Sequence, residues 1–175
     1  MKVLSILAFL ACAAIAQAPQ RTRQQVVAIE DFSHAGMHVG MTLAALKMQY
    51  AEAKNVTTIA DRSRFGGADF ESWYVDTAEV KARCDFYKGR LGMLRFEVPT
   101  EQGPEFIQEL ETRFGKSNPV PKFPPLPALE QTRLTWVSPN SKRTITVSVV
   151  KEAATPKLHY YVSYTDPGRL PGMRR

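Results

Sequence analysis

The sequence contains only two cysteines, which restricts the cross-links the folded chain can form. Cys12 lies within an N-terminal apolar run, residues 3–15, of the length found in secretory signal peptides. If that segment is removed, Cys84 is the single thiol left, and a disulfide within the mature chain is excluded. Cys84 alternates with Ala82 and Phe86 in a strand-like pattern, which favours a buried, inert thiol over a reactive one.

Long apolar stretches are also missing. Outside residues 3–15, no run approaches the roughly 20 apolar residues that a transmembrane helix needs. That run follows Lys2 and ends at two small-x-small cleavage signatures, residues 14–16 and 16–18. The combination predicts a signal peptide over residues 1–16, and therefore export with no transmembrane span in the mature chain.

Export leaves the final location open between two interpretations. Residues 17–25 are polar and predict a tether ahead of a periplasmic or secreted domain. Residues 9–12 weakly resemble a bacterial lipobox, so the alternative is a lipid anchor at Cys12. In either case we expect no nucleic-acid partner, because export takes the chain away from most nucleic acid.

Catalytic signatures are absent as well. The sequence has neither a G-x-S-x-G elbow nor a glycine-rich phosphate loop. His34 and His38 have the spacing of a helical zinc pair, but Gly36 interrupts the helix that such a pair would need. We therefore expect no catalytic residue, no cofactor and no metal site. The enzyme alternative would require a functional pair among His34, His38, Cys84 and His159.

Positive charge is in excess, and it is unevenly distributed. The formal net charge is +6, and residues 131–175 hold eight Lys or Arg against two acidic residues. A basic C-terminal third predicts weak contact with an anionic surface, unless these side chains form an ordinary solvated strand face. The residues expected to make that contact from one sheet face are Arg133, Lys142, Arg143, Lys151 and Lys157.

Apolar periodicity predicts two helices and a series of short strands. Thr42 is the expected N-cap of a first helix over residues 43–53, and Pro104 begins a second helix that ends at Gly115. The strands are expected over residues 56–60, 70–77, 81–87, 91–98, 133–137, 144–150 and 158–164, with a loop over 63–69. Five prolines make residues 117–130 a rigid connector within one domain, residues 26–166, and residues 167–175 are expected to form a frayed basic tail.

The order of these elements predicts an α+β fold. Two helices would pack on one face of an antiparallel β-sheet, in two half-repeats of αβββ type. Neighbouring aromatic residues in the strands would point to opposite faces, so one ring of each pair would be exposed. Exposed aromatic rings are typical anchors of protein interfaces, and the candidates are Trp73, Tyr74 and Tyr161.

Two short motifs carry a family resemblance. Residues 40–46 read GMTLAAL, and residues 84–91 read CDFYKGRL. This pair resembles the BamE/SmpA-like group of small bacterial envelope lipoproteins, in which similar motifs open a helix and close a strand hairpin. More distantly, it is similar to the β-lactamase-inhibitor-protein fold, which is built of similar units. The resemblance covers residues 36–98 and implies an exported protein-binding module.

These observations together predict a non-enzymatic protein-interaction module of the bacterial cell envelope or periplasm. Its expected partner is another envelope protein. The alternative is a secreted inhibitor that presents Trp73, Tyr74 or the proline-rich segment to a hydrolase. A small enzyme is the remaining alternative.

Overall fold

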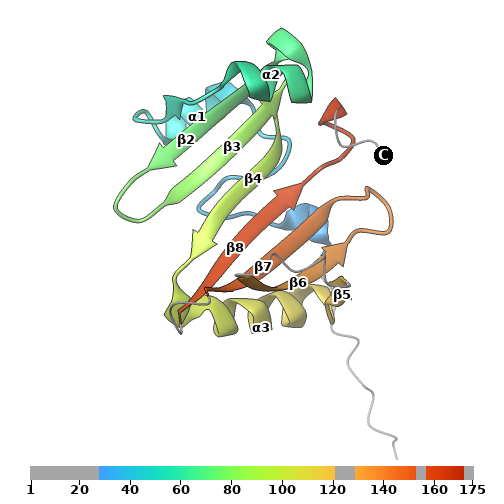
Figure 1. Cartoon of the computed structure of the whole chain (residues 1–175). Helices are drawn as coiled ribbons and strands as arrows, with labels where there is room; N and C mark the ends of the chain where they lie inside the picture. The colour runs from blue at the N-terminus through green and yellow to red at the C-terminus, as the bar shows by residue number, and fades with distance from the viewer. Residues whose placement is uncertain (1–27, 121–128, 153–156, 172–175) are drawn as a thin grey trace, which may run out of the picture.

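A computed structural model describes residues 28–120, 129–152 and 157–171 of the chain (Figure 1). The expected signal peptide and tether, and with them Cys12, lie outside the described residues, as does most of the proline-rich connector. Among the residues that are described, no helix has the length and apolar character needed to cross a membrane.

The described residues form a single antiparallel sheet in the order β1-β2-β3-β4-β8-β7-β6-β5. Only β1 is as short as two residues, and the other seven strands are longer. The strands are β1 Lys54–Asn55, β2 Phe70–Asp76, β3 Lys81–Tyr87, β4 Arg90–Val98, β5 Asn118–Val120, β6 Leu129–Val137, β7 Thr144–Glu152 and β8 Leu158–Thr165. The α-helices are α1 Leu43–Gln49, α2 Ile59–Phe65 and α3 Gly103–Phe114.

The chain is built from two halves that each have a helix followed by four strands, and the first half has the extra helix α2 between β1 and β2. Helix α1 is followed by β1 to β4, and helix α3 is followed by β5 to β8. The last strands of the two halves, β4 and β8, pair antiparallel at the centre, so each half adds its earlier strands outward in the same order. The predicted helix-then-strands halves are therefore present, with four strands in each in place of the predicted three.

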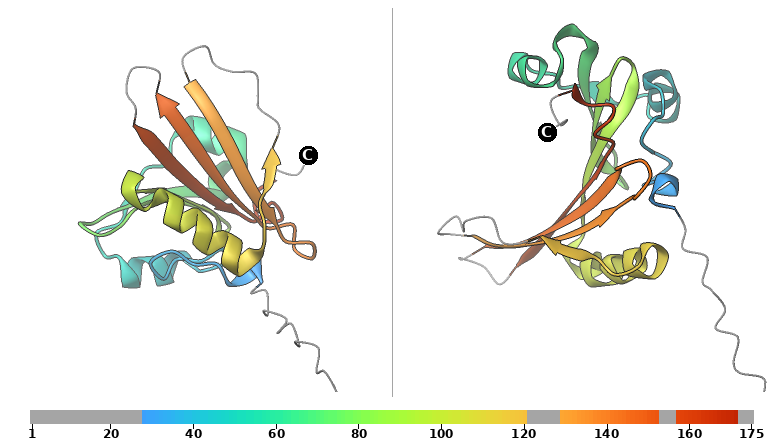
Figure 2. Two further views of the ribbon diagram at one scale, coloured as in Figure 1. Left: turned by 90° about the horizontal axis from the view of Figure 1, so that it is seen from below. Right: turned by 90° about the vertical axis from the view of Figure 1, so that its right-hand side faces the viewer.

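One face of the sheet packs against both predicted helices. Leu46 of α1 and Leu110 of α3 are fully buried in the same apolar cluster as Cys84, Leu94 and Val162 of the sheet. Figure 2 shows α1 and α3 on one side of the sheet and α2 on the other. The α+β architecture with two helices on one sheet face is therefore confirmed, and α2 is an additional helix.

Helix α2 corrects the predicted strand over residues 56–60 and much of the predicted loop over 63–69. The Thr58 side chain accepts a hydrogen bond from the Asp61 backbone, and the Asp61 carboxylate accepts one from the Thr58 backbone. This capping box starts a helix at Ile59 in spite of the β-branched residues before it. The first helix is also shorter than expected, ending at Gln49, although Thr42 caps it as predicted.

The first part of the C-terminal tail is packed, which corrects the expectation that it is frayed from residue 167 onward. Leu170 is 1% exposed and lies against Phe70 and Met93 on the side of the sheet that carries α2. The Asp166 carboxylate holds this segment through the Gly168 backbone and the Arg169 guanidinium. Residues 172–175 lie outside the described residues.

Candidate binding surface

The sheet has a second face, which α1 and α3 do not cover; it is called here the far face. Strand alternation and the pairing registers place on it the residues that alternate with the helix-covered core. They are Phe70, Ser72, Tyr74, Asp76, Lys81, Arg83, Asp85, Tyr87, Met93, Arg95, Glu97, Gln131, Arg133, Thr135, Val137, Thr144, Thr146, Ser148, Val150, His159, Tyr161, Ser163 and Thr165. Most are polar and half-buried, as on the solvent-facing side of an antiparallel sheet.

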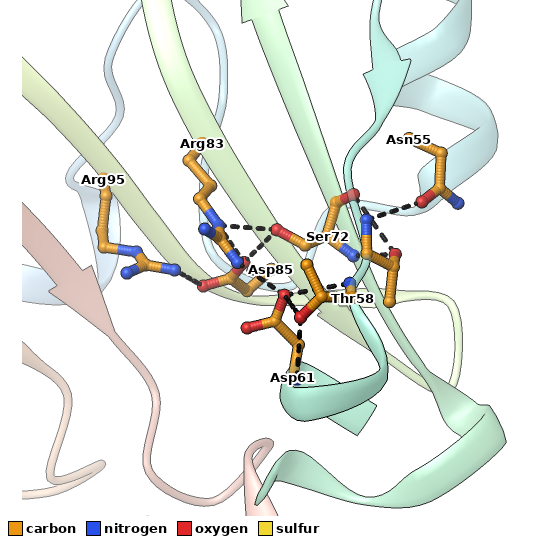
Figure 3. A network of polar contacts seen from close by, with 8 residues as sticks. Asn55, Thr58, Asp61, Ser72, Arg83, Asp85 and Arg95 are labelled. Carbon is orange, nitrogen blue, oxygen red and sulfur yellow. Dashed lines mark hydrogen bonds and ion pairs between the residues drawn. The ribbon is translucent and has the colours of Figure 1, made fainter. Parts of the chain in front are cut away.

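Helix α2 covers one end of the far face through a polar network (Figure 3). The Asp85 side chain is 3% exposed and accepts hydrogen bonds from Ser72, Arg83 and Arg95. Arg83 also donates to Asp61 of α2, with 3.1 Å between Nη2 and Oδ2. The network therefore ties α2 to β2, β3 and β4.

Asp61, which α2 contributes to this network, has a lowered pKa. Burial by itself would raise the pKa of Asp61, but hydrogen bonds from Thr58 and the nearby Arg83 charge outweigh it and lower that pKa. Asp61 is thus held as a carboxylate at neutral pH, the form that both attracts Arg83 and completes the helix cap.

A cleft of about 1170 Å³ opens along β4. Its lining includes Arg83, Arg95 and Tyr161 of the far face, together with Phe96 and Phe106 from the helix-covered side. The cleft therefore takes residues from both faces where β4 extends past the start of β3.

Tyr161 is the most exposed aromatic residue of the far face, at 46%. It lies between Glu97 of β4 and Ser148 of β7, and its ring lies parallel to that of His159 at 6.0 Å between centroids. The His159 Nδ1 atom is 2.9 Å from the Glu97 carboxylate. Tyr160, which precedes Tyr161 in the strand, is buried in the core, as alternation predicts.

The structure separates the other two predicted aromatic anchors. Tyr74 is on the far face and lines the cleft. Trp73 is on the helix-covered side at the edge of the core, where its indole donates to Glu71 and the Lys47 ammonium lies 4.2 Å from its ring centroid. Trp73 and Tyr161 therefore belong to different surfaces.

The five predicted basic residues do not form one unpaired patch. Arg143 is ion-paired with Asp166 at 3.2 Å, so its charge is already compensated within the chain and does not support the predicted contact with an anionic surface. Arg133 is on the far face opposite Ser148, whereas Lys151 belongs to the alternate set of β7 residues. Lys142 is exposed in the turn before β7, and Lys157 is exposed just before β8.

The residues of the enzyme alternative are dispersed. Cys84 is buried on the helix-covered side, where its thiol contacts Met37, whereas His159 is on the opposite face of the sheet. His34 stacks on Phe96 with 3.6 Å between ring centroids, and burial lowers its pKa. Within residues 28–120, 129–152 and 157–171, no three His, Cys, Asp or Glu side chains are placed to hold a metal ion.

Burial raises the pKa of the Cys84 thiol to about 12. The thiol should therefore remain protonated and shielded from pH 6 to about 9, since only the thiolate is a strong nucleophile. We expect a chromogenic disulfide reagent to leave native Cys84 unmodified throughout this range and to modify it stoichiometrically in denaturant. Rapid modification of the native protein at pH 7 would contradict this burial.

Comparison with known proteins gives no relative from which a function could be transferred: no protein-family model, no curated protein and no solved structure matches this chain.

The far-face arginines Arg83 and Arg95 were not among the residues predicted from the sequence. The available signal was the polar alternation of residues 83 and 85 inside an otherwise apolar strand.

Proposed function

We propose that the protein is a non-enzymatic protein-interaction module of the bacterial cell envelope or periplasm that binds a partner protein through the far face. The observation that carries this proposal is the far face itself, a polar sheet surface left uncovered by α1 and α3. Tyrosine and arginine are enriched at binding hot spots, and hydroxyl side chains give adaptable hydrogen bonds around them. The far face combines Tyr74 and Tyr161 with Arg83, Arg95 and a row of Ser and Thr residues.

The position of Tyr161 also supports this proposal. It is near the middle of the sheet, with strands on both sides, and almost half of its surface is exposed. A residue with a large amphipathic ring in such a position gains buried area on contact at a low cost in side-chain entropy. The proposed envelope location follows from the predicted signal peptide and the family resemblance, both of which remain predictions.

The environment of Cys84, the candidate nucleophile, supports a binding role over a catalytic one. An acyl-transfer or hydrolytic cysteine needs a low thiol pKa and a base within hydrogen-bond reach. Burial raises the pKa of Cys84 to about 12, and His159 is on the other side of the sheet. These two residues therefore give no support to the enzyme alternative.

Site-specific photo-cross-linking tests the proposal in the native envelope. A benzophenone amino acid replaces Tyr161 in one variant and Gln108, on the exposed side of α3, in a matched control. We expect the Tyr161 position to yield one discrete protein adduct that excess unmodified protein suppresses, and the Gln108 position to yield none. Identical adducts at both positions, or none at either, would count against binding through the far face. Identification of a hydrolase in the adduct would select the inhibitor version of this function.

A further inference from the structure

Arg83 and Arg95 are direct neighbours across the β3–β4 ladder on the far face. Two like charges placed opposite each other on adjacent strands destabilise a sheet unless other groups compensate them. Neither guanidinium turns away to avoid its neighbour, because both reach the same carboxylate, that of Asp85 (Figure 3). The pair is therefore held together by the fold.

The acceptors that compensate the two positive charges are Asp85, Ser72 and Asp61. Asp85 lies buried at the base of the network, while Ser72 and Asp61 engage Arg83 at 2.7 and 3.1 Å. These bonds use the Nε and Nη2 atoms of Arg83 and the Nη2 atom of Arg95. Among the described residues, the Nη1 group of neither arginine has an acceptor. Two fixed guanidinium groups thus keep donors available.

Both arginine side chains are partly exposed in the cleft. The Arg83 and Arg95 side chains are 34% and 41% exposed, and both line the cleft along β4. A guanidinium is planar and offers its N–H groups in a fixed fork, a geometry that matches a carboxylate. Tyr74 lies across the ladder from Arg83, and Ser163 lies across from Arg95, so hydroxyl groups flank the pair.

The charge of the far-face part of the cleft favours an acidic ligand. The whole lining holds five basic and four acidic residues, but Glu79 is in the β2–β3 turn, Glu101 in the 3-10 turn before α3 and Glu109 on α3. The far-face strands themselves contribute three basic residues, Lys81, Arg83 and Arg95, and one acidic residue, Glu97. Glu97 is itself in contact with His159. Charge complementarity of this kind steers an oppositely charged surface to a site and fixes its orientation there.

From these observations we infer that the partner docks an acidic loop into the cleft, with an Asp or Glu carboxylate bound by Arg83 and Arg95. This inference rests on the proposed function and specifies its partner chemistry. The carboxylate receives its N–H donors from the two guanidinium groups. The network under the arginines holds them in the binding geometry before the partner arrives.

The test uses a peptide probe and the intact protein. The probe is an acetylated, amidated peptide of sequence GSDEDEGS, and its matched control is GSNQNQGS. We expect the acidic peptide to shift the side-chain Nε–H signals of Arg83 and Arg95 in ¹⁵N NMR spectra. The amide peptide should bind at least about tenfold more weakly, because it lacks the charge-assisted hydrogen bonds.

Two variants at one position separate binding from folding. Ser163→Glu places a carboxylate of the chain itself beside Arg95 and should abolish peptide binding while the thermal midpoint is kept or raised. Ser163→Gln introduces a similar bulk without charge and should bind within about threefold of the parent protein, since it adds no competing carboxylate. A charge control, Arg62→Gln on the exposed side of α2, should leave binding unchanged.

The outcomes distinguish this inference from the proposed function. If neither peptide shifts the arginine signals while the Tyr161 cross-link still forms, the acidic-loop inference is wrong and the binding function stands. Absence of the Tyr161 cross-link with intact peptide binding would overturn the proposed function, and the arginine pair would then be an anion-binding site without a protein partner. Arginine shifts induced only by phosphatidylglycerol vesicles, and not by the acidic peptide, would replace the protein loop with a lipid surface.

Discussion

Replacing Gly103 with alanine is expected to destabilise the protein by about 3 kcal/mol, at the upper end of overpacking costs. In most helices the same substitution is stabilising, by about 1 kcal/mol. Here a Cβ atom at residue 103 would lie 2.3 to 2.5 Å from three atoms of the Tyr160 ring. Tyr160 is 4% exposed and packed in the core, so its ring has no free space to move into. The added methyl group would therefore push the first turn of α3 away from the sheet.

Urea unfolding of the variant measures this effect as a lower midpoint with an unchanged slope. The control Glu105→Ala lies in the same helical turn but is exposed, and should shift stability by no more than about 0.5 kcal/mol. In a Tyr160→Ala background the clash is gone, so adding Gly103→Ala should cost nothing further. An equal loss in both backgrounds would show that the Tyr160 ring is not the cause.

Most of the sheet and the longest helix were predictable because their patterns are local. Alternation along residues 81–87 and 158–165 and the Pro104-to-Gly115 helix signals matched the structure closely. Helix α2 was missed because Val56, Thr57 and Ile59 favour strand by propensity. The capping residues Thr58 and Asp61 decided otherwise, and that signal is present in the sequence as a T-x-x-D spacing.

Packing without periodicity could not be predicted. Leu170 is a single apolar residue among Pro, Gly and Arg, and nothing in its neighbourhood indicates burial. It is buried because the Asp166 carboxylate turns the chain back over Phe70 and Met93. Contacts of this kind join segments that are 77 and 100 residues apart in the sequence, where local patterns carry no information.

The candidate site was predicted in part. Alternation correctly separated exposed Tyr161 from buried Tyr160, but it could not show that Trp73 packs at the core edge. The juxtaposition of Arg83 and Arg95 depends on the β3–β4 register, which shifts between Asp85 and Phe86. A register that contains an irregularity cannot be counted from the sequence, since each one-residue shift exchanges the two faces.

Asp85→Ala is the second substitution for which we expect a large effect, a loss of about 3 kcal/mol in unfolding free energy. The change removes a buried acceptor from Arg83, Arg95 and Ser72 at once. It also leaves two guanidinium groups opposite each other without their shared counter-charge. Because both arginines keep partial contact with water, the cost should stay at the lower end of that for breaking a buried ion pair.

The matched control is Asp76→Ala, which removes an exposed carboxylate at 3.7 Å from Lys81 on the same hairpin and should cost less than about 1 kcal/mol. Urea unfolding compares the two variants directly.

A sharper readout is the α2 helix, which Arg83 links to the sheet through Asp61. Amide hydrogen exchange in α2, Ile59–Phe65, should accelerate in Asp85→Ala more than exchange in α3, Gly103–Phe114, because α2 is linked to the network and α3 is not. Equal acceleration in both helices would mean that Asp85 stabilises the sheet as a whole and does not act as the anchor of α2.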